Sequence, residues 1–241
     1  MADSETTNNG DHGWLQRPLQ DPNDIERYYD DWVGSYNATL ESWGYDAPVV
    51  ASQLVLKAIA SRVQASLSTA PSAGLGTVDR AITVLDVGCG TGMCGLALQA
   101  LGFTSVDGID LSQVSLDAAA GTGTYRTTTR LNLDQLPLPF DDHSYSAALS
   151  VGVLSYVPAL RPLFVDLARI LVPNAPFVFT QRQDLWIERD TEQLLADLLA
   201  DGTFAAATWT DPRPYMPGNA DFSDQIGVRY VSMLTPPSPP T

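Results

Sequence analysis

The spacing of hydrophobic positions changes near residue 80, and the change predicts two kinds of structure. Before it, apolar and aromatic side chains recur every three or four positions over residues 25–43 and 50–63, as on one face of a helix. Asp21 followed by Pro22 is typical of the start of the first helix. After residue 80, short apolar runs alternate with helical stretches, which is typical of an α/β fold with a mostly parallel sheet.

The alternating half of the chain contains seven predicted strands. They cover 82–87, 104–110, 125–131, 144–150, 177–181, 204–210 and 226–234. The predicted helices between them cover 93–101, 112–120, 159–171 and 191–200. Because no helix separates the last two strands, we expect them to pair antiparallel.

This pattern predicts one domain over residues 21–235. Residues 21–68 are expected to form an N-terminal helical cover, and residues 80–235 the core that binds a cofactor. The polar segment 1–20 and the proline-rich segment 236–241 are expected to be tails outside the fold.

Composition narrows the classes of partner. The chain has 241 residues, of which 44% are hydrophobic and 17% charged, enough apolar residues for a sizeable core. Thirteen Lys and Arg against 28 Asp and Glu give a net charge of −15, which disfavours nucleic acid and anionic membrane surfaces as partners. With two cysteines, two histidines and no readable signal peptide or spanning segment, we expect a cytoplasmic protein without a metal site.

A glycine-rich turn follows the first predicted strand of the core. Gly88, Gly90 and Gly92 lie between this strand and the next helix, where glycines let a ligand approach the backbone closely. Asp110 ends the following strand, where a carboxylate can accept hydrogen bonds from both hydroxyls of a ribose. Together these residues predict a site for a nucleoside cofactor.

Two cofactors compete for this site. Residues 90–95 satisfy the G-x-G-x-x-G pattern of dinucleotide sites, and an NAD-type oxidoreductase therefore stays an alternative. However, Asp86 precedes the first glycine, and residues 81–125 contain no Lys or Arg. A carboxylate without a cation opposes a pyrophosphate and favours a positively charged ligand. The residues thus favour S-adenosyl-L-methionine, whose sulfonium is cationic.

Several segments then resemble class I S-adenosylmethionine-dependent methyltransferases. Residues 85–92 resemble the first motif of that family, and residues 106–112 its second motif, in which the final acid holds the ribose. Residues 132–140 are similar to the segment whose acid contacts the adenine, and 144–152 to the fourth strand beneath the sulfonium. The turn at 170–175 departs from the usual proline-glycine-glycine.

A narrower resemblance lies outside these motifs. Tyr28-Tyr29-Asp30-Asp31-Trp32, the step at 45–48 and the closing 180–182 are similar to the methyltransferase-like proteins named for the Williams–Beuren syndrome region. The resemblance implies a doubly wound, seven-stranded Rossmann-like sheet of order 3-2-1-4-5-7-6. In that fold the last strand is antiparallel and N-terminal helices cover the site.

The resemblance also implies which residues bind the cofactor. Asp86 and the glycine loop would frame the methionine portion, Asp110 the ribose, Asp134 the adenine, and residues 150–152 the floor. The full expected set is Asp86, Gly88, Cys89, Gly90, Gly92, Asp110, Leu111, Leu133, Asp134, Ser150, Val151, Tyr28 and Trp32. Tyr28 and Trp32 have a second interpretation as plain core packing.

The candidates for catalysis are Tyr156, Arg182 and Tyr28. Tyr156 could orient or deprotonate an acceptor, whereas Arg182 could bind a carboxylate or form a structural ion pair with Asp184. We expect His143, in a polar turn, to take no part.

The segment 215–218 is expected to line an acceptor pocket. The predicted reaction is methyl transfer to an oxygen or nitrogen of a small molecule, by proximity and desolvation. A protein acceptor, and a non-catalytic module that binds the cofactor and a partner, stay open as alternatives.

Overall fold

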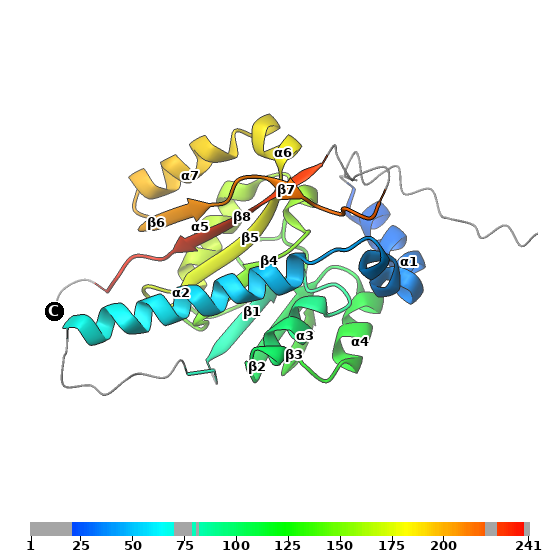
Figure 1. Ribbon diagram of the computed structural model, residues 1–241, viewed down its shortest axis with the longest axis horizontal. Helices are drawn as coiled ribbons and strands as arrows, with labels where there is room; N and C mark the ends of the chain where they lie inside the picture. The colour runs from blue at the N-terminus through cyan, green and yellow to red at the C-terminus, as the bar shows by residue number, and fades with distance from the viewer. Residues whose placement is uncertain (1–20, 70–78, 81, 220–225, 239–241) are drawn as a thin grey trace, which may run out of the picture.

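The computed structural model describes residues 21–69, 79–80, 82–219 and 226–238 (Figure 1). The helices are α1 (Pro22–Ser42), α2 (Ala47–Thr69), α3 (Met93–Ala100), α4 (Gln113–Gly121), α5 (Leu160–Ile170), α6 (Gln183–Glu188) and α7 (Thr191–Ala200), with a 3-10 turn η2 (Leu154–Tyr156). The strands are β1 (Thr83–Val87), β2 (Ser105–Asp110), β3 (Thr127–Arg130), β4 (Ala147–Ser150), β5 (Pro176–Arg182), β6 (Ala206–Trp209), β7 (Arg213–Pro214) and β8 (Gly227–Leu234).

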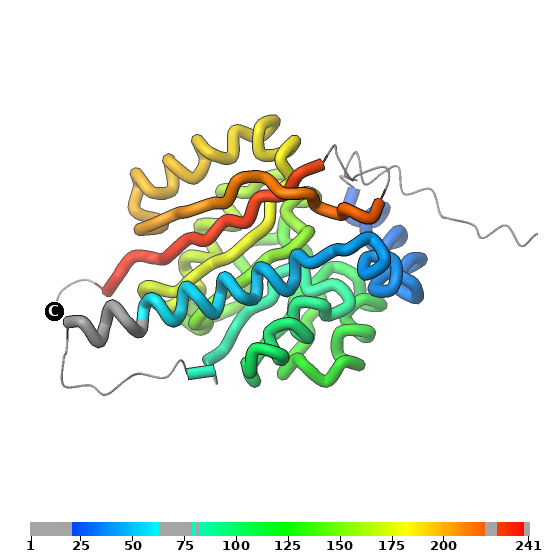
Figure 2. Tube along the Cα trace, viewed as in Figure 1, coloured from blue at the N-terminus to red at the C-terminus, as the bar shows by residue number. Residues whose placement is uncertain are grey.

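The sheet has the predicted topology. Its strand order is β3-β2-β1-β4-β5-β8-β6, with β1 to β5 parallel and β8 antiparallel to β5 and β6. Figure 2 shows the red tube of β8 between the yellow tube of β5 and the orange tube of β6. The two-residue β7, which pairs only with β8, is an addition to the expected seven strands. Since β8 is the seventh predicted strand, the predicted order is confirmed.

Helices pack on both faces of the sheet. On one face, α2 and α3 bury Val55, Ile59 and Leu98 against alternate residues of the strands. On the other, α5 and α7 bury side chains such as Phe164 and Leu195. The side chains of each central strand point alternately into these two clusters, because successive side chains of a strand lie on opposite faces of the sheet.

The first helix starts as predicted and lies at one end of the sheet. The side chain of Asp21 accepts a hydrogen bond of 2.8 Å from the amide of Asn23, and proline occupies the first turn. Figure 1 shows α1 beyond the ends of the parallel strands, beside α4. The carboxyl ends of β1, β2 and β4 point to this region, so α1 closes over the edge where α/β sheets bind ligands.

The structure differs from the predicted boundaries in a few places. The short helix α6 and the turn η2 were not predicted, since six and three residues are too few to establish a helical period. The expected helical cover over residues 21–68 extends one residue further, because α2 ends at Thr69. The carbonyl of Pro236 accepts a hydrogen bond of 3.0 Å from Asn174, so the expected C-terminal tail is held at its first residue. The expected tail 1–20 lies outside the described residues.

Across the described ranges, no helix combines the length and apolar character needed to cross a bilayer.

Candidate functional site

A cavity of about 130 Å³, here called the main cavity, lies between the glycine loop and α1. Its walls come from α1, the glycine loop, the end of β2, the segment after β3 and the end of β4. They include Pro22, Ile25, Tyr29, Val33, Tyr36, Tyr45, Pro48, Gly88, Cys89, Gly90, Thr91, Met93, Cys94, Asp110, Leu111, Ser115, Leu131, Asn132, Leu133, Asp134, Val151, Gly152, Val153, Tyr156 and Val157.

The glycine loop needs glycine for two different reasons. Gly88, Gly90 and Gly92 all have positive φ, at 75°, 50° and 94°. A Cβ on Gly88 would lie 2.2 Å from a methyl carbon of Val153, whereas nothing lies within 4 Å of that position on Gly90. The amides of Gly88 and Cys89 both donate to the carbonyl of Ile109, so the loop is fixed to β2.

Asp110 is held rigidly at the wall of the main cavity. One of its carboxylate oxygens accepts a hydrogen bond from the amide of Gly90 at 2.9 Å, and the other from the amide of Ser112 at 3.0 Å. Burial raises the pKa of Asp110, and these backbone donors partly offset the rise. The hydroxyl of Ser112 in turn donates to Asp30 of α1 at 2.5 Å, which connects the carboxylate to the covering helix.

Asp86 lies elsewhere than expected. It is completely buried beneath the loop and does not line the main cavity. The hydroxyl of Tyr125 donates to its Oδ2 at 2.7 Å and accepts a hydrogen bond from the amide of Gly95. Its Oδ1 has no hydrogen-bond partner among the described residues, and burial raises its pKa to about 7. Asp86 is therefore connected through Tyr125 to the start of α3 and is not in the lining of the main cavity.

Most of the other residues expected to bind the cofactor line the main cavity, and a few do not. Besides Asp110, the main cavity is lined by Gly88, Cys89, Gly90, Leu111, Leu133, Asp134 and Val151. Gly92 and Ser150 are not in its lining: Gly92 caps α3, and the hydroxyl of Ser150 donates to the carbonyl of Val87. Tyr28 packs edgewise against Tyr29 and lines neither this cavity nor the chamber next to it.

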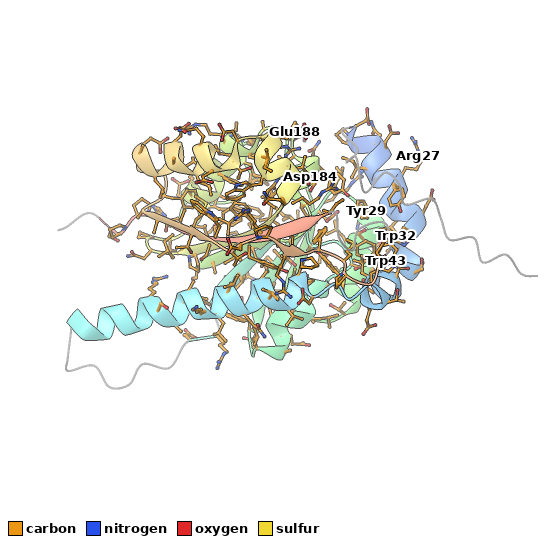
Figure 3. All side chains as sticks on the ribbon, turned by 45° about the horizontal axis from the view of Figure 1, so that its top comes forward. Arg27, Tyr29, Trp32, Trp43, Asp184 and Glu188 are labelled. Carbon is orange, nitrogen blue, oxygen red and sulfur yellow. The ribbon has the colours of Figure 1, made fainter. Side chains whose placement is uncertain are left out.

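A second, smaller space of about 20 Å³, here called the inner chamber, adjoins the main cavity. Its lining consists of Tyr29, Trp32, Tyr36, Leu40, Tyr45, Gly152, Ser155, Tyr156, Arg182, Tyr215 and Met216. Five of these residues also line the main cavity, namely Tyr29, Tyr36, Tyr45, Gly152 and Tyr156. The expectation that Tyr215 and Met216 line a pocket thus agrees with their positions. Figure 3 shows Tyr29, Trp32 and Trp43 between α1 and the rest of the molecule, whereas Arg27 lies on the outer side of α1.

The candidate catalytic side chains have different surroundings. The hydroxyl of Tyr29 donates to that of Tyr156 at 2.9 Å, and burial raises the pKa of both tyrosines. Tyr156 therefore carries its proton at neutral pH, contrary to the expectation that it could deprotonate an acceptor. Arg182 lines the inner chamber and also pairs with Asp184 at 2.6 and 3.1 Å, so the structural ion pair is present, and the binding of an acceptor carboxylate stays a prediction.

One histidine and two cysteines also have reactive side chains but are not among the candidates for catalysis. His143 occupies a turn in which its Nδ1 is 2.8 Å from the carbonyl of Leu171, and it lines neither space. Cys89 and Cys94 are free and buried, and burial raises the pKa of both thiols. His12 lies outside the described residues. The described part of the chain also has no cluster of side chains that could hold a metal ion.

Several wall residues could not be identified from the sequence. Ile25 and Val33 belong to a regular helical pattern, which predicts core packing equally well, and Tyr45 and Pro48 come from the step between the two predicted helices. Beside the wall, the side-chain oxygen of Asn37 accepts a hydrogen bond of 2.5 Å from Thr91 in the glycine loop. No local signal marks that contact, which spans more than fifty positions.

The charged side chains in the described lining of the main cavity are acidic. Asp110 and Asp134 are in its lining, and none of the described residues there is Lys or Arg. Such a wall attracts cations and repels phosphate groups.

Comparison with known proteins agrees with this geometry. Residues 84–174 match the family described as "Methyltransferase domain". The chain is 30% identical to human Methyltransferase-like protein 27 over 128 residues, which cover 53% of this chain and 46% of that protein. It is 29% identical to the 24-methylenesterol C-methyltransferase 2 of Arabidopsis thaliana over 39% of this chain and 27% of the relative. The chain thus spans less than half the length of these two relatives.

The fold has counterparts among solved structures. A Thermotoga maritima protein, described as a S-adenosylmethionine-dependent methyltransferase and possible histamine N-methyltransferase, superimposes with a TM-score of 0.57 at 14% identity. The superposition covers 87% of this chain and 99% of that one. It supports the assignment of the sheet and its flanking helices.

Proposed function

The chain carries a class I S-adenosylmethionine-dependent methyltransferase domain, and from this premise we propose that it transfers a methyl group from S-adenosyl-L-methionine to a small-molecule acceptor. The main cavity would hold the cofactor and the inner chamber the acceptor. Their shared wall at Gly152 is where the two molecules would meet.

The cofactor would lie across the glycine loop. Gly88, Cys89 and Gly90 would frame its methionine portion, and Asp110 would accept hydrogen bonds from the ribose hydroxyls. Leu111, Leu133 and Asp134 would surround the adenine, with Val151 as part of the floor. These assignments rest on the lining of the main cavity and on the fixed orientation of the Asp110 carboxylate.

One observation carries the proposal: Asp110 stands beside the glycine loop in a cavity whose described lining has two carboxylates and no cation. A sulfonium is favoured there, whereas the pyrophosphate of an NAD-type cofactor would face two negative charges without a counter-ion. The oxidoreductase alternative is therefore the weaker one, even though residues 90–95 satisfy its pattern.

The cofactor supplies an electrophilic methyl group, so the protein has to align the acceptor and exclude water. The helix α1 covers the main cavity with Ile25, Tyr29, Val33 and Tyr36, which removes water from the region of transfer. The tyrosines of the inner chamber would position the acceptor by hydrogen bonds and packing. Methyl transfer by alignment and exclusion of water requires no histidine or carboxylate acting as a base.

The methylated atom is proposed to be an oxygen or nitrogen. A carbon acceptor is the second candidate, because one of the relatives is named a sterol C-methyltransferase. A protein acceptor is disfavoured by the small inner chamber, which is enclosed by buried aromatic residues. The net charge of −15 disfavours a nucleic-acid acceptor, and we expect the protein to act in the cytoplasm.

The proposal is tested first by ligand binding. Isothermal titration should detect S-adenosylhomocysteine binding and no NAD binding, and Asp110→Ala should weaken the former by about tenfold or more, the value of a lost charged hydrogen bond. Asp117→Ala, which removes an exposed carboxylate of α4, is the matched control and should leave the affinity unchanged. Tight binding of NAD without binding of S-adenosylhomocysteine would contradict the proposal.

Activity is tested by incubating the purified protein with cell extract and methyl-labelled cofactor, and identifying the labelled product by mass spectrometry. A labelled small molecule whose formation is lost in Asp110→Ala is expected. Binding of the cofactor without any labelled product would favour the non-catalytic partner module instead.

A further inference from the structure

The inner chamber combines buried tyrosine hydroxyls with a single charged side chain. Its described lining contains Arg182, which is 5% exposed, and no Asp, Glu or His. Arg182 pairs with Asp184, whose side chain is 44% exposed and outside this lining, so the guanidinium is the charged group that faces the chamber. A chamber of this composition disfavours a buried ammonium ion and favours an anion, because burial strengthens electrostatic interactions.

Two of the tyrosines, Tyr45 and Tyr215, lie side by side in the lining of the inner chamber. Burial raises the pKa of both, so both hydroxyls carry their protons at neutral pH. Their rings pack edge to face with centroids 5.4 Å apart. A protonated hydroxyl can donate a hydrogen bond to an anionic oxygen, so Tyr215 is suited to position one.

This pair lies against the wall shared with the main cavity. A Cβ on Gly152 would lie 3.1 Å from both hydroxyl oxygens, and the φ of Gly152 is +77°. Glycine at this position thus leaves the hydroxyls of Tyr45 and Tyr215 beside the boundary where the acceptor and the cofactor would meet. The charge of Arg182 also reaches this point, because it lowers the pKa of both Tyr156 and Tyr215 against the larger effect of burial.

We propose, resting on the proposed function above, that the inner chamber selects a small acceptor with an anionic oxygen, a carboxylate or phenolate, and that Tyr215 and Arg182 position it. Transfer then forms a bond between that oxygen and the methyl carbon and breaks the bond between the methyl carbon and sulfur. The electron pair of the broken bond stays on sulfur, which becomes a neutral thioether. No proton has to leave the acceptor, which accounts for a chamber whose described lining has no base.

The charge preference can be measured with three planar probes of nearly the same shape. Benzoate, benzamide and benzamidine carry charges of −1, 0 and +1 at neutral pH. Each is titrated by calorimetry into the full chain saturated with S-adenosylhomocysteine. We expect benzoate to bind at least about tenfold more tightly than benzamidine, with benzamide between them.

Substitutions test whether Tyr215 and Arg182 cause this preference for an anionic ligand. Tyr215→Phe should weaken benzoate binding by about tenfold, the value of a hydrogen bond to a charged group, and leave S-adenosylhomocysteine affinity unchanged. Arg182→Gln should reduce the ratio of benzoate to benzamidine affinity. Tyr145→Phe is the matched control, since it removes a hydroxyl that bonds Asp107 and lies in neither space; it should change neither affinity.

The outcomes separate the two proposals. If S-adenosylhomocysteine does not bind, the proposed function itself fails. If it binds but benzamidine matches or exceeds benzoate, the tyrosine rings recognise a cation instead, and the inference is overturned. It is equally overturned if benzoate shows no saturable binding, or if Tyr215→Phe binds benzoate as the unaltered protein does.

Discussion

Asp86 and Asp110 belong to neighbouring parallel strands, but only Asp110 reaches the main cavity. Backbone amides surround the carboxylate of Asp110, whereas Asp86 has one hydrogen-bonded oxygen and one without a partner among the described residues. Such a buried carboxylate is costly when ionised, which is why its pKa rises to about 7. The two residues thus show how the surroundings of a carboxylate decide its charge.

Asp86 should therefore make the stability of the protein depend on pH. Since its pKa is higher in the folded state than in the unfolded chain, the unfolded chain ionises first, and stability falls as the pH rises from about 4 to about 7. Asp86→Asn removes this fall and keeps an oxygen for the hydroxyl of Tyr125. We expect the unfolding free energy of the variant minus that of the unaltered protein to increase over this range, by an amount on the order of 4 kcal/mol at most.

Urea unfolding at several pH values measures this difference. The control is Asp117→Asn, which changes an exposed carboxylate and should follow the unaltered protein at every pH. A difference for Asp86→Asn that does not change with pH would show that this carboxylate does not titrate with folding.

Gly88 and Gly90 allow a paired test of the glycine loop. Both have positive φ, but only at Gly88 would a Cβ collide with a neighbour, Val153. Gly90→Ala should cost about 1 kcal/mol of stability from backbone strain alone. Gly88→Ala should cost at least about 3 kcal/mol, because Val153 or the loop must also move. Chemical denaturation measures both, and equal costs would contradict the collision.

At the scale of elements, α1 is attached to the core by aromatic side chains that pack against it and by several polar contacts. Asn37 bonds Thr91, Asp30 bonds Ser112, and Glu26 pairs with Arg130 at 2.6 Å. Few of its residues are buried, Trp32 and Leu40 being the ones that are. A helix held in this way opens at a lower free energy than the sheet beneath it.

Asn37→Ala should loosen α1 selectively. Loss of one hydrogen bond costs about 1 kcal/mol, so amide hydrogen exchange in α1 should become roughly fivefold faster, with β1 and β4 unchanged. Gln193→Ala removes a comparable exposed contact, that of Gln193 with Asp197 in α7, and should leave α1 unaffected. The prediction fails if exchange in α1 is the same in both variants.

At the scale of the whole molecule, the net charge of −15 opposes compaction. Salt screens this repulsion, because the Debye length shortens from roughly 14 Å at about 0.05 M to roughly 4 Å at about 0.5 M. We therefore expect the thermal midpoint to rise with sodium chloride over this range. Sucrose of equal osmolality controls for general solvent effects, and a midpoint that falls with salt would mean that attractive ion pairs dominate.

Much of the fold followed from local pattern. Strand runs, glycine turns and the Asp21 cap predicted the order of elements, and the absence of a helix before residues 226–234 predicted their antiparallel pairing. The elements missed were α6, η2 and the two-residue β7, which are too short to show a period. Asn174, where the family has glycine, adopts a φ of 59°, a conformation that asparagine tolerates.

The sequence predicted the candidate site best where its residues lie at the end of a single strand. The glycine loop and Asp110 have a local signature, because each must meet a backbone requirement at its own position. Asp86 has the same kind of signature, yet it is completely buried and is not in the lining of the main cavity. The inner chamber was predicted only in part, through Tyr156, Arg182 and the segment 215–218, because its residues come from separate segments that no local pattern joins.

The sequence by itself determined the α/β architecture, the position of the glycine loop and the charge of the main cavity. These depend on the period of apolar residues and on residue type, both of which are local properties. Tertiary structure alone decided which residues of α1 line the main cavity, that Asp86 is buried and that Arg182 faces a group of tyrosines. Such contacts join residues far apart in the chain, and only the packing of helices on the sheet brings them together.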